Sequence, residues 1–177
     1  NMDLDDLARK LSPKTRCIML VHWGGYPLDM DRLNKILDQC LDKFGFRPRV
    51  IQDCAHAMGT LYKGKSLIGL SDFSTYSFQA IKHITCGDGG ALITTTPESY
   101  KLARLTRWYG IDREGPRSDF RCEADIKHWG FKFHMNDIAA TIGLTNLSIL
   151  DDTVQRHKSN GAFYNRELQN VPGVRLL

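Results

Sequence analysis

Three side chains of different chemistry follow short apolar stretches in the middle of the chain. Asp53 closes one stretch, Ser77 lies near the end of a second at 73–78, and Lys82 follows five residues later with apolar neighbours. Ligands of open α/β sheets bind at the carboxyl ends of the strands. Because partial burial disfavours the ammonium form, Lys82 is a candidate Schiff-base amine. Asp53 is a candidate partner for a pyridinium nitrogen.

The motifs around these residues carry a family resemblance. The sequences QDCAHAMG, SFQAIKHIT and GDGGALIT resemble those of the DegT/DnrJ/EryC1/StrS sugar aminotransferases, which are pyridoxal-phosphate (PLP) enzymes of fold type I. The interval of 29 residues from Asp53 to Lys82 suits that family's Asp and Schiff-base Lys. The resemblance continues through VHWGGYPLDMDRL, RWYGIDRE and GFKFHMNDIAATIGL and therefore covers almost the whole chain.

The resemblance implies a role for each residue of the candidate site. Lys82 would carry pyridoxal 5'-phosphate covalently and move protons as acid and base, and Asp53 would keep the ring nitrogen protonated. His56 would face the ring oxygen, where relatives carry Gln or His. The alternative interpretation is that His56 is an interior histidine whose hydrogen bonds are satisfied within the protein. Ser77 would bind the cofactor phosphate together with backbone N–H groups, and its alternative is a turn cap.

Lys132 departs from the family pattern. It stands in GFKFH, where the family usually shows Asn in a GYNYR-like motif. A lysine could reach the cofactor phosphate as a point charge across the interface of a homodimer, and a solvated lysine is an equal alternative. The glycines of HWGGYP, together with His22, are expected to shape a turn.

The hydrophobic pattern predicts an α/β fold with a mostly parallel sheet. The continuous apolar run at 17–21 reads as a strand buried on both faces. Asp29 is expected to cap a helix with one apolar stripe from Leu33 to Phe44, and a strand at 49–53 follows. Glycines between 55 and 70 suggest a short helical turn and a hairpin, and two more strands are expected at 73–78 and 91–95.

The second half of the chain is expected to be mainly helical. Helices are predicted at 97–109, from a cap at Asn136 to Leu150, and at 152–168, with an irregular charged segment at 111–129. By resemblance, residues 1–150 would form part of the PLP-binding large domain, a three-layer α/β/α structure that is incomplete in this chain. Residues 151–177 would form a helix leading to a small C-terminal domain that is absent.

Composition excludes several classes of protein. The 177 residues are 42% hydrophobic and 25% charged, with no apolar run long enough for a transmembrane helix. The polar, acidic start argues against a signal peptide, so the cytoplasm is the expected location. Five scattered cysteines without a CxxC pair suit reduced thiols, and six histidines without metal-binding spacing predict no metal site. A net charge of +4 without a basic stripe argues against nucleic acid as a partner.

Together, these features favour an enzyme of amino-sugar or polysaccharide biosynthesis. By resemblance, it would transfer an amino group from glutamate to a nucleotide-linked keto-sugar. One alternative is a PLP-dependent sugar dehydratase of the same family, but those relatives lack the Schiff-base lysine, so Lys82 argues against it. The other is a truncated, catalytically silent PLP-fold domain that acts as a binding module.

Overall fold

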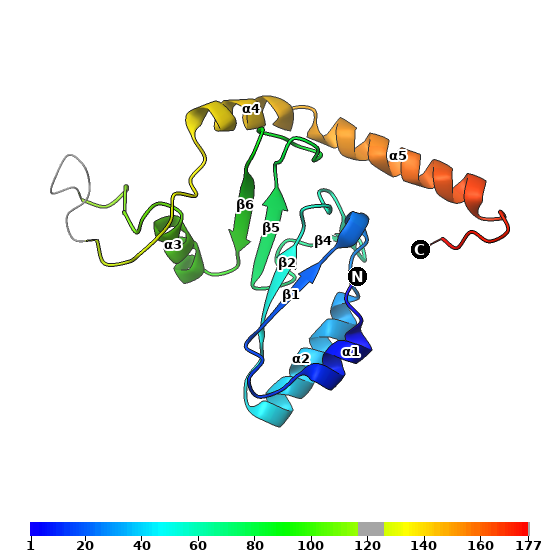
Figure 1. Cartoon of the computed structure of the whole chain (residues 1–177), viewed down its shortest axis with the longest axis horizontal. Helices are drawn as coiled ribbons and strands as arrows, with labels where there is room; N and C mark the ends of the chain where they lie inside the picture. Colours follow the sequence, from blue (N-terminus) through cyan, green and yellow to red (C-terminus); the bar gives the residue numbers. More distant parts are fainter. Residues whose placement is uncertain (117–125, 177) are drawn as a thin grey trace.

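The computed structural model describes residues 1–116 and 126–176. Among these residues, four strands form the main sheet in the order β1-β2-β5-β6 (Figure 1). The first three strands are parallel, and β6 runs antiparallel to β5. The strands are β1 (Cys17–Val21), β2 (Arg49–Asp53), β5 (Phe73–Ser77) and β6 (Gly90–Thr94). The predicted α/β character and mostly parallel sheet are therefore confirmed.

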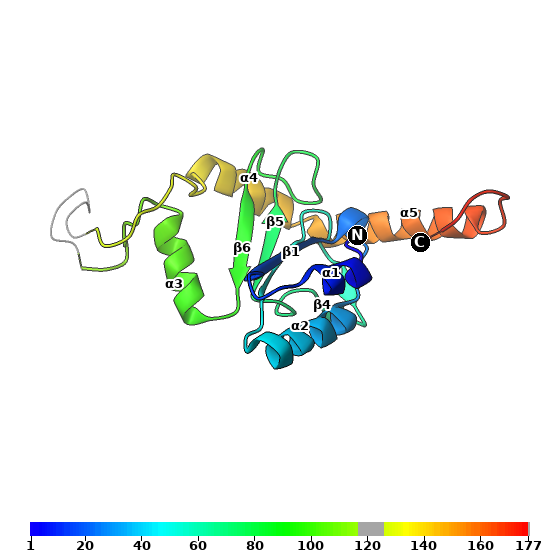
Figure 2. The ribbon, with the colours of Figure 1, turned by 60° about the horizontal axis from the view of Figure 1, so that its bottom comes forward.

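Helix α2 (Met30–Phe44) connects β1 to β2 and begins and ends where the sequence predicts. The Asp29 carboxylate accepts a hydrogen bond from the Arg32 N–H at 3.0 Å, which caps the first turn. Gly45 ends the helix with a φ of 73°, a left-handed conformation that glycine adopts at little cost. Helix α1 (Leu4–Lys10) packs beside α2, as Figure 2 shows.

The main hydrophobic core lies between these two helices and one face of the sheet. Leu33 of α2 is fully buried, and Ile18 and Leu20 of β1 are nearly so. Burial of such side chains contributes roughly 1.5–3 kcal/mol each. The buried members of this core are Leu4, Ile18, Leu20, Leu28, Met30, Leu33, Ile36, Leu37 and Val50.

The opposite face of β1 is exposed, which contradicts the expected burial on both faces. Burial alternates along the strand, with Met19 59% and Val21 37% exposed. Successive side chains of a strand point to opposite faces of the sheet. An apolar run is therefore buried on both faces only where elements cover both sides, and the described residues cover β1 on the α2 side.

A small hairpin follows β2, as predicted from the glycines of this region. Strands β3 (Leu61–Tyr62) and β4 (Lys65–Ser66) pair antiparallel around a turn in which Lys63 and Gly64 both have positive φ. Such a two-residue turn matches the twist of the strands it joins. The Tyr62 hydroxyl donates to Asp29 at 2.8 Å and ties the hairpin to the start of α2.

Three helices follow the sheet: α3 (Pro97–Thr106), α4 (Asp137–Leu147) and α5 (Leu150–Leu168). Helix α3 ends before the predicted position 109, because Tyr109 and Gly110 adopt left-handed φ values of 54° and 78°. The predicted irregular segment at 111–129 is described except for 117–125, which lie outside the described residues. Within the described ranges, no helix has the length and apolar character that a membrane span requires.

Helix α4 crosses above the ends of β5 and β6, and α5 extends away from the sheet (Figure 1). Asn136 caps α4 as predicted, accepting from the Ala139 N–H at 2.9 Å. The side-chain amide of Asn146 donates to the Thr85 carbonyl oxygen at 3.1 Å, which fixes α4 to the loop after β5. This loop carries Lys82.

Candidate active site

The carboxyl ends of β1, β2 and β5 meet at one edge of the sheet, together with the start of β6. Asp53 is in register with Val21 on one side and Thr75 on the other, and Ser77 is in register with Gly90. Residues in register share a face of the sheet, as do residues two apart on one strand. Asp53 and Ser77 therefore lie at the same edge and on the same face, the one that α2 does not cover.

Asp53 has a carboxylate oxygen available for a ligand. Its Oδ1 accepts a hydrogen bond from the Ala55 N–H at 2.9 Å, which orients the side chain. Its Oδ2 accepts none within residues 1–116 and 126–176. The half-buried carboxylate can therefore accept a hydrogen bond from a cationic N–H group.

The Lys82 amine has no ion-pair or hydrogen-bond partner in the described part of the chain. The loop that carries it is nevertheless well fixed. The Phe78 N–H donates to Gly89 O at 2.8 Å, and the Cys86 N–H donates to Phe78 O at 2.9 Å. The Lys82 N–H itself donates to Gln79 O at 3.0 Å. The backbone is held while the amine remains free to react.

Ser77 ends β5, opposite Gly90 at the start of β6. Its hydroxyl accepts a hydrogen bond from the Gln79 N–H at 3.3 Å, in keeping with the turn-capping alternative. A β-carbon on Gly90 would lie 2.6 Å from the Tyr76 carbonyl oxygen, so only glycine fits at that position. The backbone at the start of β6 is thus close to that of Tyr76.

His56 reaches the same edge from the loop after β2. Its Nδ1 accepts a long hydrogen bond of 3.4 Å from the Gly24 N–H. Its ring packs edge-to-face against Trp23, with centroids 4.7 Å apart. His56 therefore lies between the ends of β1 and β2, and its predicted contact with a cofactor ring stays a prediction.

A buried polar network beneath this edge was not foreseen from the sequence. The Nδ1 of His22 accepts from the Leu28 N–H at 3.1 Å, so its Nε2 carries the proton that is donated to Gln52 at 2.7 Å. The Gln52 amide in turn donates to the Ser71 hydroxyl at 2.6 Å. Burial lowers the pKa of His22 and keeps it neutral. One sequence signal pointed to Gln52: it lies two residues after Val50, on the buried face of β2.

Lys132 lies elsewhere, beside the end of α3. It forms an isolated bridge with Trp108, and its amine lies 5.2 Å from the centre of the Trp108 ring. His134 stacks on the same ring at 3.5 Å. Within the described residues, Lys132 therefore contacts Trp108 rather than the strand edge.

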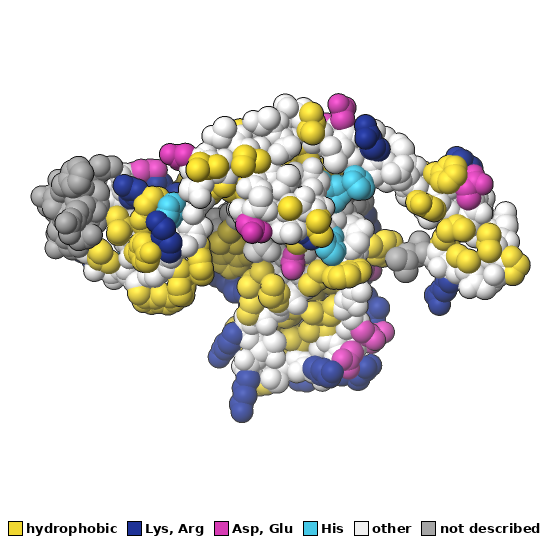
Figure 3. Space-filling model, turned by 45° about the horizontal axis from the view of Figure 1, so that its top comes forward, with side chains coloured by type: hydrophobic (Ala, Val, Ile, Leu, Met, Phe, Trp, Pro, Cys, Tyr) yellow, Lys and Arg dark blue, Asp and Glu magenta, His cyan; other side chains and the backbone are white. Residues whose placement is uncertain are grey.

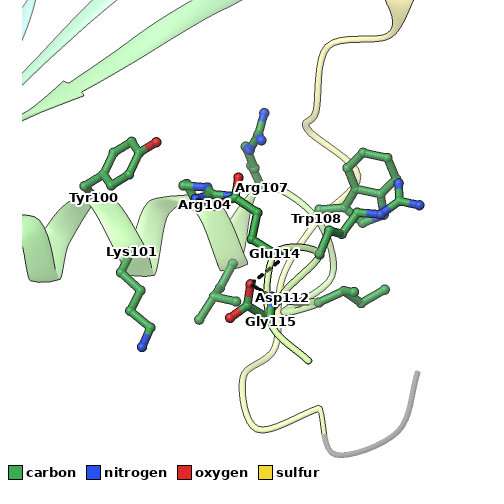
Figure 4. Close-up of a pocket in the computed structure, with 11 residues that line it drawn as sticks. Tyr100, Lys101, Arg104, Arg107, Trp108, Asp112, Glu114 and Gly115 are labelled. Atoms are coloured by element: carbon green, nitrogen blue, oxygen red, sulfur yellow. Dashed lines mark hydrogen bonds and ion pairs between the residues drawn. The ribbon is translucent and has the colours of Figure 1, made fainter. Parts of the chain in front are cut away.

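A cavity of about 370 Å³ opens next to this cluster (Figure 4). Arg104 of α3 forms an ion pair with Glu114 across it, and Trp108 borders one end. Its lining residues include none of the five predicted site residues. The cavity is therefore separate from the strand edge that carries Asp53, Ser77 and Lys82.

The mostly parallel sheet and its connecting helix α2 define the class of protein, an α/β protein. The family model of the DegT/DnrJ/EryC1/StrS aminotransferase family matches residues 1–177. The chain belongs to this family.

Solved structures of related proteins show that they share the fold of this chain. AtS13 from Actinomadura melliaura is 51% identical, with a TM-score of 0.92 over 99% of this chain and 47% of its own. The sugar aminotransferase CalS13 from Micromonospora echinospora is 43% identical, with a TM-score of 0.91 over 99% of this chain and 47% of its own. The PLP form of Spr1654 from Streptococcus pneumoniae is 28% identical, with a TM-score of 0.81 over 96% of this chain and 45% of its own.

This chain therefore spans slightly less than half the length of these three relatives. The predicted fold class, a mixed α/β fold with the mostly parallel sheet of fold type I relatives, is confirmed. The predicted covering of both faces of the sheet is not seen within the described residues, because one face of β1 is exposed.

Proposed function

We propose that the protein takes part in the PLP-dependent transfer of an amino group from glutamate to a nucleotide-linked keto-sugar. Family membership supports aminotransferase chemistry, and the similarity to CalS13 supports a sugar substrate. The observation that carries the proposal is the position of Asp53 and Ser77 at one edge of the sheet, with Lys82 on the loop that follows β5 at that edge.

The residues at this edge fit pyridoxal phosphate by the chemistry of their free atoms. Asp53 offers an unused carboxylate oxygen for a protonated ring nitrogen, and Lys82 offers an unpaired amine for the aldehyde carbon. The Ser77 hydroxyl and the adjoining backbone suit a phosphate group, because several donors hold a dianion best. We infer that His56, on the loop after β2, would contact the ring oxygen.

Bound pyridoxal phosphate supplies an electron sink for the carbon that gives up or receives the amino group. Lys82 would hold the cofactor covalently until the amino group of the donor takes its place on the cofactor. The freed Lys82 amine would then take the proton from the α-carbon of the donor and return a proton at the end of each half-reaction. Asp53 would maintain the positive charge on the ring nitrogen.

The same proposal includes a homodimer and a domain division. Residues 1–150 would belong to the large domain, and 151–177 would form the helix that leads out of it. Because Lys132 lies away from the strand edge of its own chain, it suits a role in the site of a second copy, where its charge would reach the cofactor phosphate.

Borohydride reduction of the protein with PLP tests this function. Before reduction we expect visible absorbance from covalently bound cofactor, and after reduction peptide mapping should find the pyridoxyl group on Lys82. Exposed Lys63 and Lys65 are matched controls, and Lys63→Ala and Lys65→Ala should leave the labelling unchanged. A label on Lys63, Lys65 or Lys132 would contradict the assignment. No absorbance band would favour the alternative of a silent binding domain.

A further inference from the structure

A pair of histidines lies beside Lys82 and has no role in the proposed chemistry. His83 follows Lys82 directly, and its ring packs edge-to-face against that of His157 from α5, with centroids 4.8 Å apart. The Nδ1 atom of His83 is buried and has no hydrogen-bond partner within the described residues. A buried polar atom without a partner costs roughly 1–3 kcal/mol and calls for an explanation.

The charged groups that shift the pKa of His83 are all cationic. Burial lowers the pKa of His83, and the positive charges of His157, His56 and Lys82 lower it further. No carboxylate is among the groups that shift it. A negative charge bound here would offset this repulsion and give Nδ1 an acceptor.

The position of α5 against this loop is closely defined. A β-carbon on Gly59 would lie 2.6 Å from a methyl group of Val154, so the helix packs directly on the loop after β2. His157 lies almost one turn further along α5 and is exposed. Histidine side chains gather near the middle of the face shown in Figure 3. A solute can therefore reach the pair from its His157 side.

A cavity of about 330 Å³ is lined by His157 and by residues of α5 before it, and His83 is not among its lining residues. Arg156 and Thr153 line it and offer further hydrogen-bond donors, while Asp152 is its one carboxylate. The space lies along α5, next to the histidine pair. It is sufficient for a small carboxylate or phosphate group.

We propose that His83 and His157 form a subsite for an oxyanion, a carboxylate or phosphate group of a reactant, beside Lys82. The assignment to a reactant rests on the proposed function, whereas the anion site itself rests on the geometry of the pair. Two reactants carry such groups: the amino-acid donor has carboxylates, and the nucleotide-linked sugar has a diphosphate. Imidazole and guanidinium donors suit both.

Histidine ring signals in NMR spectra of the PLP-free protein test the subsite. L-glutamate and uridine diphosphate are titrated separately, with sodium chloride at matched ionic strength as the control for screening. We expect a saturable shift of the His83 signal with one of the probes. Saturation with glutamate would identify the donor carboxylate as the occupant, and saturation with uridine diphosphate would identify the sugar nucleotide.

Two variants and one control extend the measurement to affinity. His83→Gln and His157→Gln should each weaken binding of that probe about tenfold by calorimetry. His128→Gln changes an exposed histidine outside the pair and should bind the probe as the wild type does. Because His157 is exposed, its replacement tests the subsite even if His83→Gln impairs folding. Absence of saturation with both probes, or unchanged affinity in His157→Gln, would overturn the subsite.

The result of the anion-binding experiment is independent of the result of the pyridoxyl-labelling experiment. Pyridoxyl labelling of Lys82 without anion binding would overturn the subsite alone. Anion binding at the pair without labelling of Lys82 would overturn the proposed function alone.

Discussion

Asp53 and Lys82 form no ion pair within the described residues, whereas some exposed charged side chains do. Lys10 lies 2.7 Å from the carboxylate of Asp6, and Lys63 pairs with Asp31. Such exposed ion pairs contribute about 0–1 kcal/mol to the free energy of unfolding. An unpaired amine on a well-fixed loop is instead suited to react with a ligand. A carboxylate with one unused oxygen is suited to bind one.

Replacing Asp53 by Asn tests its role at the ring nitrogen. The amide keeps the size of the side chain but removes the negative charge that favours a protonated nitrogen. We expect the single-turnover rate with glutamate to fall at least about tenfold, or about 1.4 kcal/mol in barrier. Cofactor labelling of Lys82 should persist. Asp42→Asn, an exposed change on α2, is the matched control, and equal rates in both variants would contradict the role.

At the level of elements, buried polar groups set the geometry of the strand ends. The His22–Gln52 hydrogen bond joins β1 to β2 directly below Asp53. Since neither side chain is exposed, loss of one partner would leave the other unsatisfied in the core. The network thereby supports the turn that carries Trp23 and Gly24, on which His56 rests.

The lowered pKa of His22 predicts a loss of stability in acid. The unfolded histidine binds a proton near pH 6.5, whereas the folded one does so only at lower pH. Its contribution to stability is therefore present above about pH 6.5 and is lost as the pH falls toward the folded pKa. The slope can approach about 1.4 kcal/mol per pH unit for one proton.

Urea unfolding between pH 8 and pH 5 measures this dependence. His22→Gln keeps a donor and an acceptor but cannot titrate, so its stability should fall less steeply than that of the wild type. His128→Gln, a change at an exposed histidine, should follow the wild-type curve. Parallel curves for wild type and His22→Gln would contradict the prediction.

The end of α3 also packs closely against the segment that precedes α4. The Phe131 N–H donates to Thr106 O at 2.7 Å, and the Phe133 N–H donates to Arg107 O at 2.9 Å. A β-carbon on Gly110 would overlap the His128 carbonyl oxygen. These contacts hold Lys132 against Trp108.

Two glycine substitutions separate steric overlap from backbone strain. Gly110 and Gly64 have the same φ of 78°, but a β-carbon on Gly64 would meet nothing within 4 Å. Each change to Ala costs roughly 1–2 kcal/mol for the left-handed conformation. Gly110→Ala should lose about 1–3 kcal/mol more in urea unfolding, because the backbone must move apart. Equal losses would show that the packing at the end of α3 is looser than described.

At the level of the whole molecule, apolar side chains remain on the surface around the candidate site. Met19 and Leu92, on the open face of the sheet, are 59% and 50% exposed. On α4, Ile138 and Leu144 are 75% and 70% exposed. Large exposed apolar side chains that gather into a patch mark interaction sites. Their exposure here is consistent with the proposed homodimer.

Subunit complementation tests the dimer and the role of Lys132 together. Lys82→Ala and Lys132→Ala proteins are mixed under conditions of proven subunit exchange. If Lys132 acts on the neighbouring site, the mixed dimer places both lesions in one site and leaves the other intact. We expect the mixture to regain part of the wild-type activity. No recovery, with Lys132→Ala itself inactive, would show that Lys132 acts within its own chain.

Local features of this protein were predictable from the sequence alone. The cap at Asp29, the apolar stripe of α2 and the hairpin around Gly64 all follow from residues close to one another in the chain. The motifs identified the family, and the strand pattern placed Asp53 and Ser77 near strand ends. The chemical roles of these two residues, and those of His56, Lys82 and Lys132, stay predictions.

Long-range partners and burial were decided only by the tertiary structure. The run at 17–21 is apolar throughout, yet one face of β1 is exposed, because burial depends on which elements lie against each side of a sheet. Likewise, His22 meets Gln52 and His83 meets His157 only through packing of elements distant in sequence. Periodicity reports which way a side chain points along its own element, but the group that it meets is determined by the packing of the whole chain.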